Sequence, residues 1–237
     1  MRFSLILSLC ALITGCTSGQ SRQQVPAQTY PTFIMSLYDD AKPRPSTPPT
    51  APMRVAVAQV GELVPPQAML DHLRQNKAMF QRVDGIPAVF DDYSQNGSLP
   101  TTPKQITRDR VARLQRMTLD LGLDYLFIYG DTVSNYTREN PLQLLDLTIV
   151  GAFVIPSREV RATGKAAGAL IDAKTGSVLF IASADTEQAK MATNSNQEGE
   201  TTKVVQNARE SLTLRLADQL IARTQEVALT KPLPLGN

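Results

Sequence analysis

Hydrophobic residues are distributed unevenly along the chain, and their pattern divides it into four parts. An almost uninterrupted apolar stretch, residues 3–13, follows the basic Arg2 and ends shortly before Cys16. Polar residues and proline dominate residues 17–52, after which regular apolar patterns begin. We therefore predict a signal peptide at 1–15, a Pro-rich tether at 16–52, a folded domain at 53–230 and a tail at 231–237.

The first part of the predicted domain has the pattern of a strand, a helix and a second strand. Residues 54–60 are apolar on both faces and rich in β-branched side chains, which indicates a buried strand. Pro65 and Pro66 then start a helix whose apolar side carries Met69, Leu70, Leu73 and Phe80. Residues 83–89 predict a short second strand, and residues 91–100 a polar loop.

The next helix has the best start signal in the chain. Thr102 can cap it, Pro103 fits the first turn, and Gln105 completes a capping box. Gly122 ends the helix, and residues 123–130 follow as a central strand. The predicted core face of the helix consists of Val111, Leu114, Met117 and Leu121.

A hairpin and a long helix are predicted for the rest of the domain. Residues 167–171 and 177–182 flank the turn sequence Asp-Ala-Lys-Thr-Gly, where Gly176 is placed for positive φ. Residues 131–141 alternate weakly and could extend the central strand as an exposed ribbon.

The polar residues 187–200 indicate a mobile segment, and residues 202–225 repeat apolar positions near the helical period. These elements predict an α/β fold (α+β mixed) with a single mixed β-sheet, flanking helices and a C-terminal closing helix.

Two apolar segments each leave two interpretations open. Residues 142–155 are either a core strand or buried helix, or a surface that binds another protein; they are too short and interrupted to span a membrane. Residues 30–38, inside the tether, are either a short segment that packs back on the domain or a docking segment for a partner.

Cys16 is the most informative single residue. It is the last residue of the sequence Leu-Ile-Thr-Gly-Cys. The basic Arg2 and the short apolar stretch at residues 3–13 precede it, as in the signal peptide and lipobox of bacterial lipoproteins. This pattern predicts cleavage before Cys16, diacylglycerol on its sulfur and an acylated amine. Thr17 follows where aspartate would often signal retention in the inner membrane, so we expect an outer-membrane anchor facing the periplasm.

Composition narrows the class of protein. Hydrophobic residues make up 42% of the chain and charged residues 19%, as in a globular domain with a proper core. The formal net charge is only +2, and no basic run stands out, so no nucleic-acid partner is expected. Cys10 lies in the predicted signal peptide and Cys16 is the lipidation site, which leaves no thiol for a disulfide or a catalytic nucleophile.

Few residues suggest catalysis or metal binding. His72 is the only histidine, so a histidine-cluster metal site is excluded, and we interpret it as a surface residue. Gly164 and Lys165 lack the remainder of a phosphate-binding loop. Asp91, Asp92 and Asp131 are the candidate catalytic carboxylates, although such groups are mostly solvated or capping. We expect no cofactor and no metal.

Residues 167–180 resemble the hairpin of CsgG/TolB-N-type periplasmic domains, which carry an Asp-x-x-Thr-Gly turn before a closing helix. A similarity to the rhombotarget lipoproteins covers most of the mature chain. It rests on the lipobox, on residues 36–40 of the tether, on the strand at 54–57 and, most distinctively, on residues 147–156. The family name implies genomic association with rhombosortase, an intramembrane serine protease. Substrates of rhombosortase carry a C-terminal Gly-Gly, an apolar helix and a basic tail, and this pattern is not found in residues 231–237.

These observations favour a non-catalytic, lipid-anchored accessory or assembly lipoprotein of the bacterial envelope. Its partners would be the membrane, through the N-terminal lipid, and an envelope protein. Because CsgG-like relatives assemble into rings, the resemblance also favours a homo-oligomer. A periplasmic hydrolase and a small-ligand-binding module are the alternatives.

Overall fold

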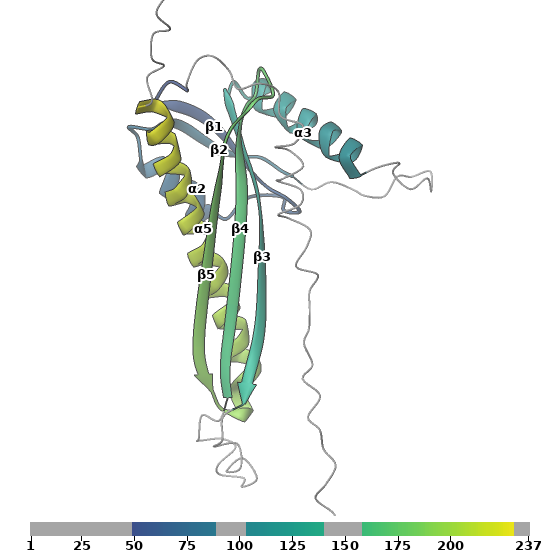
Figure 1. Ribbon diagram of the computed structural model, residues 1–237, viewed down its shortest axis with the longest axis vertical. Helices are drawn as coiled ribbons and strands as arrows, with labels where there is room; N and C mark the ends of the chain where they lie inside the picture. Colours follow the sequence, from purple (N-terminus) through teal and green to yellow (C-terminus); the bar gives the residue numbers. More distant parts are fainter. Residues whose placement is uncertain (1–48, 89–102, 140–157, 230–237) are drawn as a thin grey trace, which may run out of the picture.

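The structure contains one mixed β-sheet. It is a computed structural model and describes residues 49–88, 103–139 and 158–229. Its five strands lie in the order β2-β1-β3-β4-β5 (Figure 1). The strands are β1 (Met53–Gln59), β2 (Phe80–Gly85), β3 (Tyr125–Glu139), β4 (Arg158–Asp172) and β5 (Val178–Ala192). The helices are α2 (Gln67–Gln75), α3 (Pro103–Asp120) and α5 (Gln197–Leu229), with the short 3₁₀ helix η2 (Asn194–Asn196) before α5.

The sheet combines a parallel and an antiparallel part. β1 pairs in parallel with both β2 and β3, whereas β3, β4 and β5 form an antiparallel meander. Because β3 is the middle strand, the prediction of a central strand after Gly122 is confirmed. The α/β class, the single mixed sheet and the C-terminal helix are confirmed with it.

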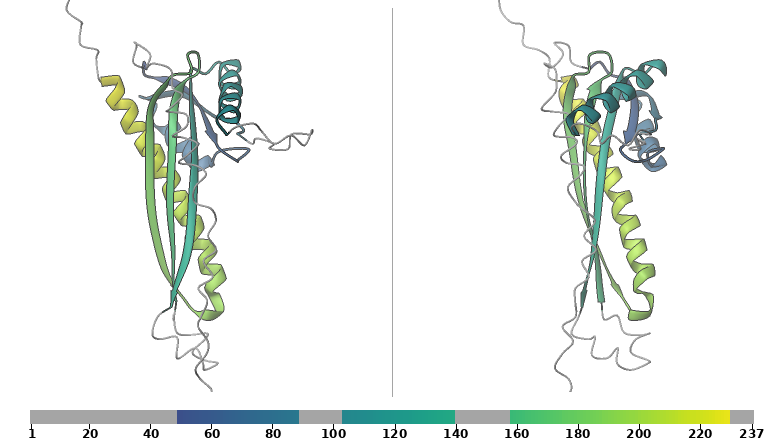
Figure 2. Two further views of the ribbon diagram at one scale, coloured as in Figure 1. Left: turned by 45° about the vertical axis from the view of Figure 1, so that its right-hand side comes forward. Right: turned by 90° about the vertical axis from the view of Figure 1, so that its right-hand side faces the viewer.

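Helices cover both faces of the sheet. On one face, α2 and α5 pack on a cluster that includes Val55, Phe127 and Leu170. On the other face, α3 contributes Val111 and Leu114 to a second cluster. All of residues 55–58 are buried, which agrees with the prediction that the first strand is apolar on both faces. Figure 2 shows α3 beside the upper part of the sheet and α5 running along its length.

The antiparallel part extends well beyond the parallel part. The last partner of β1 is the pair Gln59–Tyr129, whereas β3 continues to Glu139, which pairs with Arg158. We call residues 131–139, 158–166 and 184–192 the distal ribbon. Strands of 15 residues are about 50 Å long, and so is the 33-residue α5. The predicted extension of the central strand as a ribbon therefore exists.

Several local predictions are wrong. Residues 187–200 are not a mobile segment: they form the end of β5, η2 and the first turn of α5, which begins before the predicted residue 202. Their sequence is polar because this part of β5 has one exposed face and contacts only α5 on the other. The second strand begins at Phe80 and not at Val83, which removes Phe80 from the preceding helix. Leu121 is 43% exposed because α3 ends at Asp120, so Leu121 lies in the turn before Gly122 and not on the core face of the helix.

The two predicted glycine turns agree with the structure. Gly122 and Gly176 have φ values of 71° and 75°, which L side chains rarely adopt. Asp172 closes the β4–β5 hairpin, because its carboxylate accepts the backbone N–H groups of Lys174 (2.8 Å) and Thr175 (3.0 Å). Thr102 and residues 142–155 lie outside the described residues, so the capping box and both interpretations of that apolar segment stay predictions.

Candidate functional site

A line of buried polar side chains marks the point where β1 ends and the distal ribbon begins. The Tyr129 hydroxyl donates to Oε1 of Gln59 (3.0 Å), and Nε2 of Gln59 donates to Oδ1 of Asp131 (2.7 Å). Arg209 of α5 lies 3.5 Å from Oδ2 of the same carboxylate. We call Gln59, Tyr129, Asp131 and Arg209 the Asp131 cluster.

The strand register explains why these residues meet. Gln59 is the last residue of β1 and lies opposite Tyr129, and Asp131 follows two residues later on the same face of β3. That face is covered by α5, so the Asp131 side chain is only 9% exposed. Burial, more than the neighbouring carboxylates of Asp131 and Glu62, raises the pKa of Tyr129 far above its ordinary value. The phenol therefore acts as a hydrogen-bond donor, and the cluster joins β1, β3 and α5.

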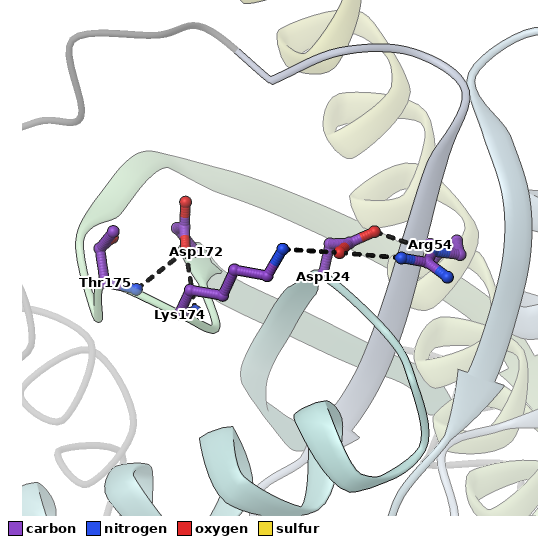
Figure 3. Close-up of polar contacts among 5 residues, drawn as sticks. All are labelled: Arg54, Asp124, Asp172, Lys174 and Thr175. Atoms are coloured by element: carbon purple, nitrogen blue, oxygen red, sulfur yellow. Dashed lines mark hydrogen bonds and ion pairs between the residues drawn. The ribbon is translucent and has the colours of Figure 1, made fainter.

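A second polar cluster lies at the opposite end of the parallel strands (Figure 3). Arg54 of β1 binds Asp124 through two hydrogen bonds, from Nε at 2.8 Å and from Nη2 at 3.0 Å. Lys174 of the hairpin turn lies 3.5 Å from the same carboxylate. The bond from Arg54 is the main cause of a lowered pKa of Asp124. This cluster ties the hairpin turn to the start of β1 and β3.

The outer face of the distal ribbon, opposite α5, carries charged and hydroxyl side chains. Arg161 in the middle strand binds Glu159 (2.9 Å) and Glu187 (2.9 Å), and Ser134 and Thr163 share a hydrogen bond of 3.1 Å. Tyr136 is 44% exposed on this face. The hydrogen bond of Arg161 with Glu159 is the largest cause of its raised pKa.

The end of the ribbon is fixed to α5 by a buried carboxylate. Glu200 in the first turn of α5 lies 2.6 Å from Nζ of Lys190 and 3.1 Å from Nζ of Lys203. These two ammonium groups lower the pKa of Glu200, with the larger effect from Lys190. Arg158 also donates to Gln197, whose amide lies 3.3 Å from the Thr137 hydroxyl. Side chains from all three ribbon strands thus contact the start of α5.

The structure separates the residues that the sequence suggested for chemistry. Asp131 is buried and hydrogen-bonded, while Cys16, Asp91 and Asp92 lie outside the described residues. His72 is partly exposed on α2 and binds Asp218 of α5 at 2.7 Å, not its neighbour Asp71. Gly164 and Lys165 lie within β4 and not in a loop, where a Cβ on Gly164 would approach Leu212 at 3.0 Å.

The other members of the Asp131 cluster were not predicted from the sequence. Gln59 is the one polar residue at the end of an apolar strand, which is the only signal that marked it. Among the described residues, no group of three His, Cys, Asp or Glu side chains is placed to hold a metal ion. Within the same ranges, no helix has the length and apolar character needed to cross a membrane.

Comparisons with known proteins give distant similarities. No protein-family model matches the chain, and no curated protein matches its sequence. Its fold is similar to the PelC dodecamer from Paraburkholderia phytofirmans, with 13% identity over 75% of this chain and 94% of that chain and a TM-score of 0.33. The lipoprotein GNA1162 from Neisseria meningitidis is 16% identical over 65% of this chain and 96% of that chain, with a TM-score of 0.26.

Protein XCC0632 from Xanthomonas campestris, a member of DUF330, is 12% identical over 78% of this chain and 92% of that chain, with a TM-score of 0.32. The structural neighbours of the chain therefore include bacterial lipoproteins.

Proposed function

We propose that this protein is a non-catalytic accessory lipoprotein of the bacterial envelope, anchored by lipid on Cys16 in the outer membrane and facing the periplasm. In this proposal it acts in assembly by binding another envelope protein through the distal ribbon. The lipobox at residues 12–16 supports the anchor, and the resemblance to rhombotarget lipoproteins and CsgG-like domains supports a role in a secretion or surface-protein pathway.

The distal ribbon is the observation that carries the proposal. β3 continues for ten residues past its last pair with β1, together with β4 and β5, and α5 covers one face of these three strands. The opposite face presents hydroxyl and charged groups with Tyr136 and Met191, which are 44% and 43% exposed. Tyrosine, methionine and arginine are enriched in protein–protein interfaces, so this face has the chemistry of a partner-binding surface.

Site-specific photo-crosslinking in cells tests the binding role. A photoreactive residue at Tyr136 or Met191 is expected to give the same defined adduct, and the matched position Leu63, which is 68% exposed near α2, is expected to give none. Equal labelling at all three positions, or no adduct at either ribbon position, would contradict the proposal.

The anchor is tested separately by Cys16→Ser. The variant is expected to accumulate as uncleaved precursor or as soluble protein. A processed form that still requires detergent for extraction would show that the lipobox interpretation is wrong. Wild-type protein that floats with inner-membrane markers would contradict the outer-membrane assignment.

Homo-oligomerisation belongs to the same proposal. In the sequence, residues 142–155 lie between Glu139, the last residue of β3, and Arg158, the first residue of β4. If these residues form the association surface, Phe153→Glu is expected to dissociate an oligomer and leave each domain folded. Sedimentation of the lipid-free wild type as a strict monomer at high concentration would refute the oligomer. Unfolding of Phe153→Glu would favour the core interpretation.

A further inference from the structure

One edge of the distal ribbon has no partner strand among the described residues. β1 leaves β3 after Tyr129, whose carbonyl accepts the last bond, from the N–H of Val60 (2.9 Å). From Asp131 to Glu139, β3 pairs with β4 on one side, and no described strand pairs with it on the other. Nine residues of β3 therefore present backbone donors and acceptors at a free edge, which is a template for another strand.

The other long edge, along β5, is protected. Arg215 of α5 donates from Nη1 to the backbone carbonyl of Asp185 at 3.0 Å. Asp185, Glu187 and Lys190 place three charges along this edge strand, as many as Asp131, Arg138 and Glu139 place along residues 131–139 of β3. Charged residues and covering side chains are the common means by which proteins block pairing at a sheet edge. The two edges therefore differ in the α5 side chain that binds the β5 backbone, and not in their number of charged residues.

Beside this edge of β3, partly buried apolar side chains lie only on the face toward α5. Val133 of β3 and Val205 of α5 are only partly buried, at the margin of a small cluster that includes Val160 and Val204. The opposite face of the edge carries Ser134 and Tyr136. A strand added here therefore needs apolar side chains at every second position, toward α5, and polar or aromatic ones between them.

Residues 32–38 of the same chain follow this pattern at every position but one. Phe33, Met35 and Leu37 alternate with Thr32, Ser36 and Tyr38, and Ile34 is the one apolar exception among the intervening residues. Residues 30–38 contain no charged residue. The sequence left open whether this apolar segment packs back on the domain. We infer that residues 30–38 add to the free edge of β3 as an antiparallel strand, with Phe33, Met35 and Leu37 against Val133 and Val205.

The chain between the segment and the domain has the necessary reach. The backbone of Thr50 hydrogen-bonds to the Tyr125 hydroxyl, so the tether enters the domain beside the first residue of β3. Thr50 lies twelve positions after Tyr38, and in the extended form that a Pro-rich sequence favours these twelve steps cover about 37 Å. Along β3, Asp131 lies about 20 Å and Glu139 about 48 Å from Tyr125.

Covalent connection also favours this occupant over a separate molecule. A segment joined to its site by a short linker has an effective concentration in the millimolar range, far above that of a second copy. The direction follows from the connection, because the chain must run from residue 38 back to Thr50 while β3 runs the opposite way. The docked strand brings residue 30 toward the tip of the ribbon, so the lipid on Cys16 emerges at the tip and not beside β1.

Hydrogen exchange of the mature, lipidated protein in nanodiscs tests the inference. The amides of residues 131–139 that point away from β4 are expected to exchange at least about tenfold more slowly in wild type than in Ile34→Pro/Met35→Pro. Proline has no backbone N–H. With proline at both positions, a donor is lost whichever of the two backbone N–H groups points toward β3. Ser46→Pro, a matched change in the Pro-rich part of the tether, is expected to retain the protection.

Three outcomes would overturn the inference. Rapid exchange of these amides in wild type would show that the edge is free. Protection that persists in Ile34→Pro/Met35→Pro would show that another segment covers it. Protection that falls on dilution of the protein would identify a second copy as the occupant.

Discussion

Gln59 donates a 2.7 Å hydrogen bond to Asp131 at the residue where β1 ends and β3 continues alone. The side-chain amide thus links the last residue of β1 to the first residue of the distal ribbon. Because Tyr129 donates to the same amide, one glutamine is satisfied on both its oxygen and its nitrogen. The junction between the two parts of the sheet is therefore held by side chains.

Removal of the Asp131 carboxylate is expected to destabilise this junction. Asp131→Ala leaves the buried amide of Gln59 without its acceptor, which costs about 1–3 kcal/mol in the free energy of unfolding. Asp185→Ala, at an exposed position of the ribbon, serves as the matched control. Denaturant unfolding measures both, and a double-mutant cycle with Tyr129→Phe is expected to show coupling. Equal effects of Asp131→Ala and Asp185→Ala would contradict the structural role.

Phe127 and Gly168 form a tight pair across β3 and β4. A Cβ on Gly168 would lie 2.5 Å from Cζ of Phe127, so Gly168→Ala is expected to cost about 1–3 kcal/mol through overpacking. Phe127→Ala removes a fully buried ring and is expected to cost about 3–5 kcal/mol. The double variant is expected to lose less than the sum, because the missing ring makes room for the new methyl group. Strict additivity would show that the two residues do not share this space.

The hairpin turn gives a test of backbone conformation. Gly176 has a φ of 75°, and a β-branched side chain at this φ is strained. Gly176→Val is expected to lower the free energy of unfolding by about 1–2 kcal/mol or more. Gly176→Asn is the matched control and is expected to lose less, since asparagine tolerates the left-handed region. Thermal unfolding that does not distinguish the two variants would contradict the turn geometry.

The Arg54–Asp124 pair predicts a specific dependence on pH. The hydrogen bond from Arg54 lowers the pKa of Asp124 in the folded state, relative to 3.8 in the unfolded chain. Its stabilisation is therefore complete above that value and is lost as the pH falls through the lowered folded-state pKa. Asp124→Asn is expected to be less stable than wild type at pH 7 and to lose less stability on acidification. Asp120→Asn, on the exposed side of α3, is expected to follow the wild-type profile in urea unfolding.

The fold could be predicted from the sequence where apolar periodicity was strong. The buried β1, the central β3, the hairpin at Asp172 and the closing helix were all marked by hydrophobic spacing or by a turn glycine. The distal half of β5 could not be recognised, because even its side chains toward α5 are small or polar: Ala184, Thr186, Gln188, Lys190 and Ala192. The side chains of the other face are mostly polar as well, so the strand has no alternation of hydrophobic and polar residues.

The candidate site was even less visible in the sequence. Asp131 was noted as one carboxylate among several, but its environment depends on Gln59 and Arg209, which lie 72 and 78 positions away in the chain. Such a cluster is created by strand register, and a single sequence does not reveal which polar side chains a register brings together. The exposure of Leu121 has a different, local origin, since it depends on the residue at which α3 ends.

The unbroken ladder from Tyr125–Asp172 to Glu139–Arg158 has a mechanical consequence. A force applied along the strands, between the tip of the ribbon and the far end of the sheet, acts on the hydrogen bonds between β3, β4 and β5 in shear. The bonds of each ladder then share the load. No single bond then carries the force, and the ribbon resists extension far better than it would resist peeling of one strand. Under the proposed function, tension between the lipid anchor and a bound partner would pass along these three strands.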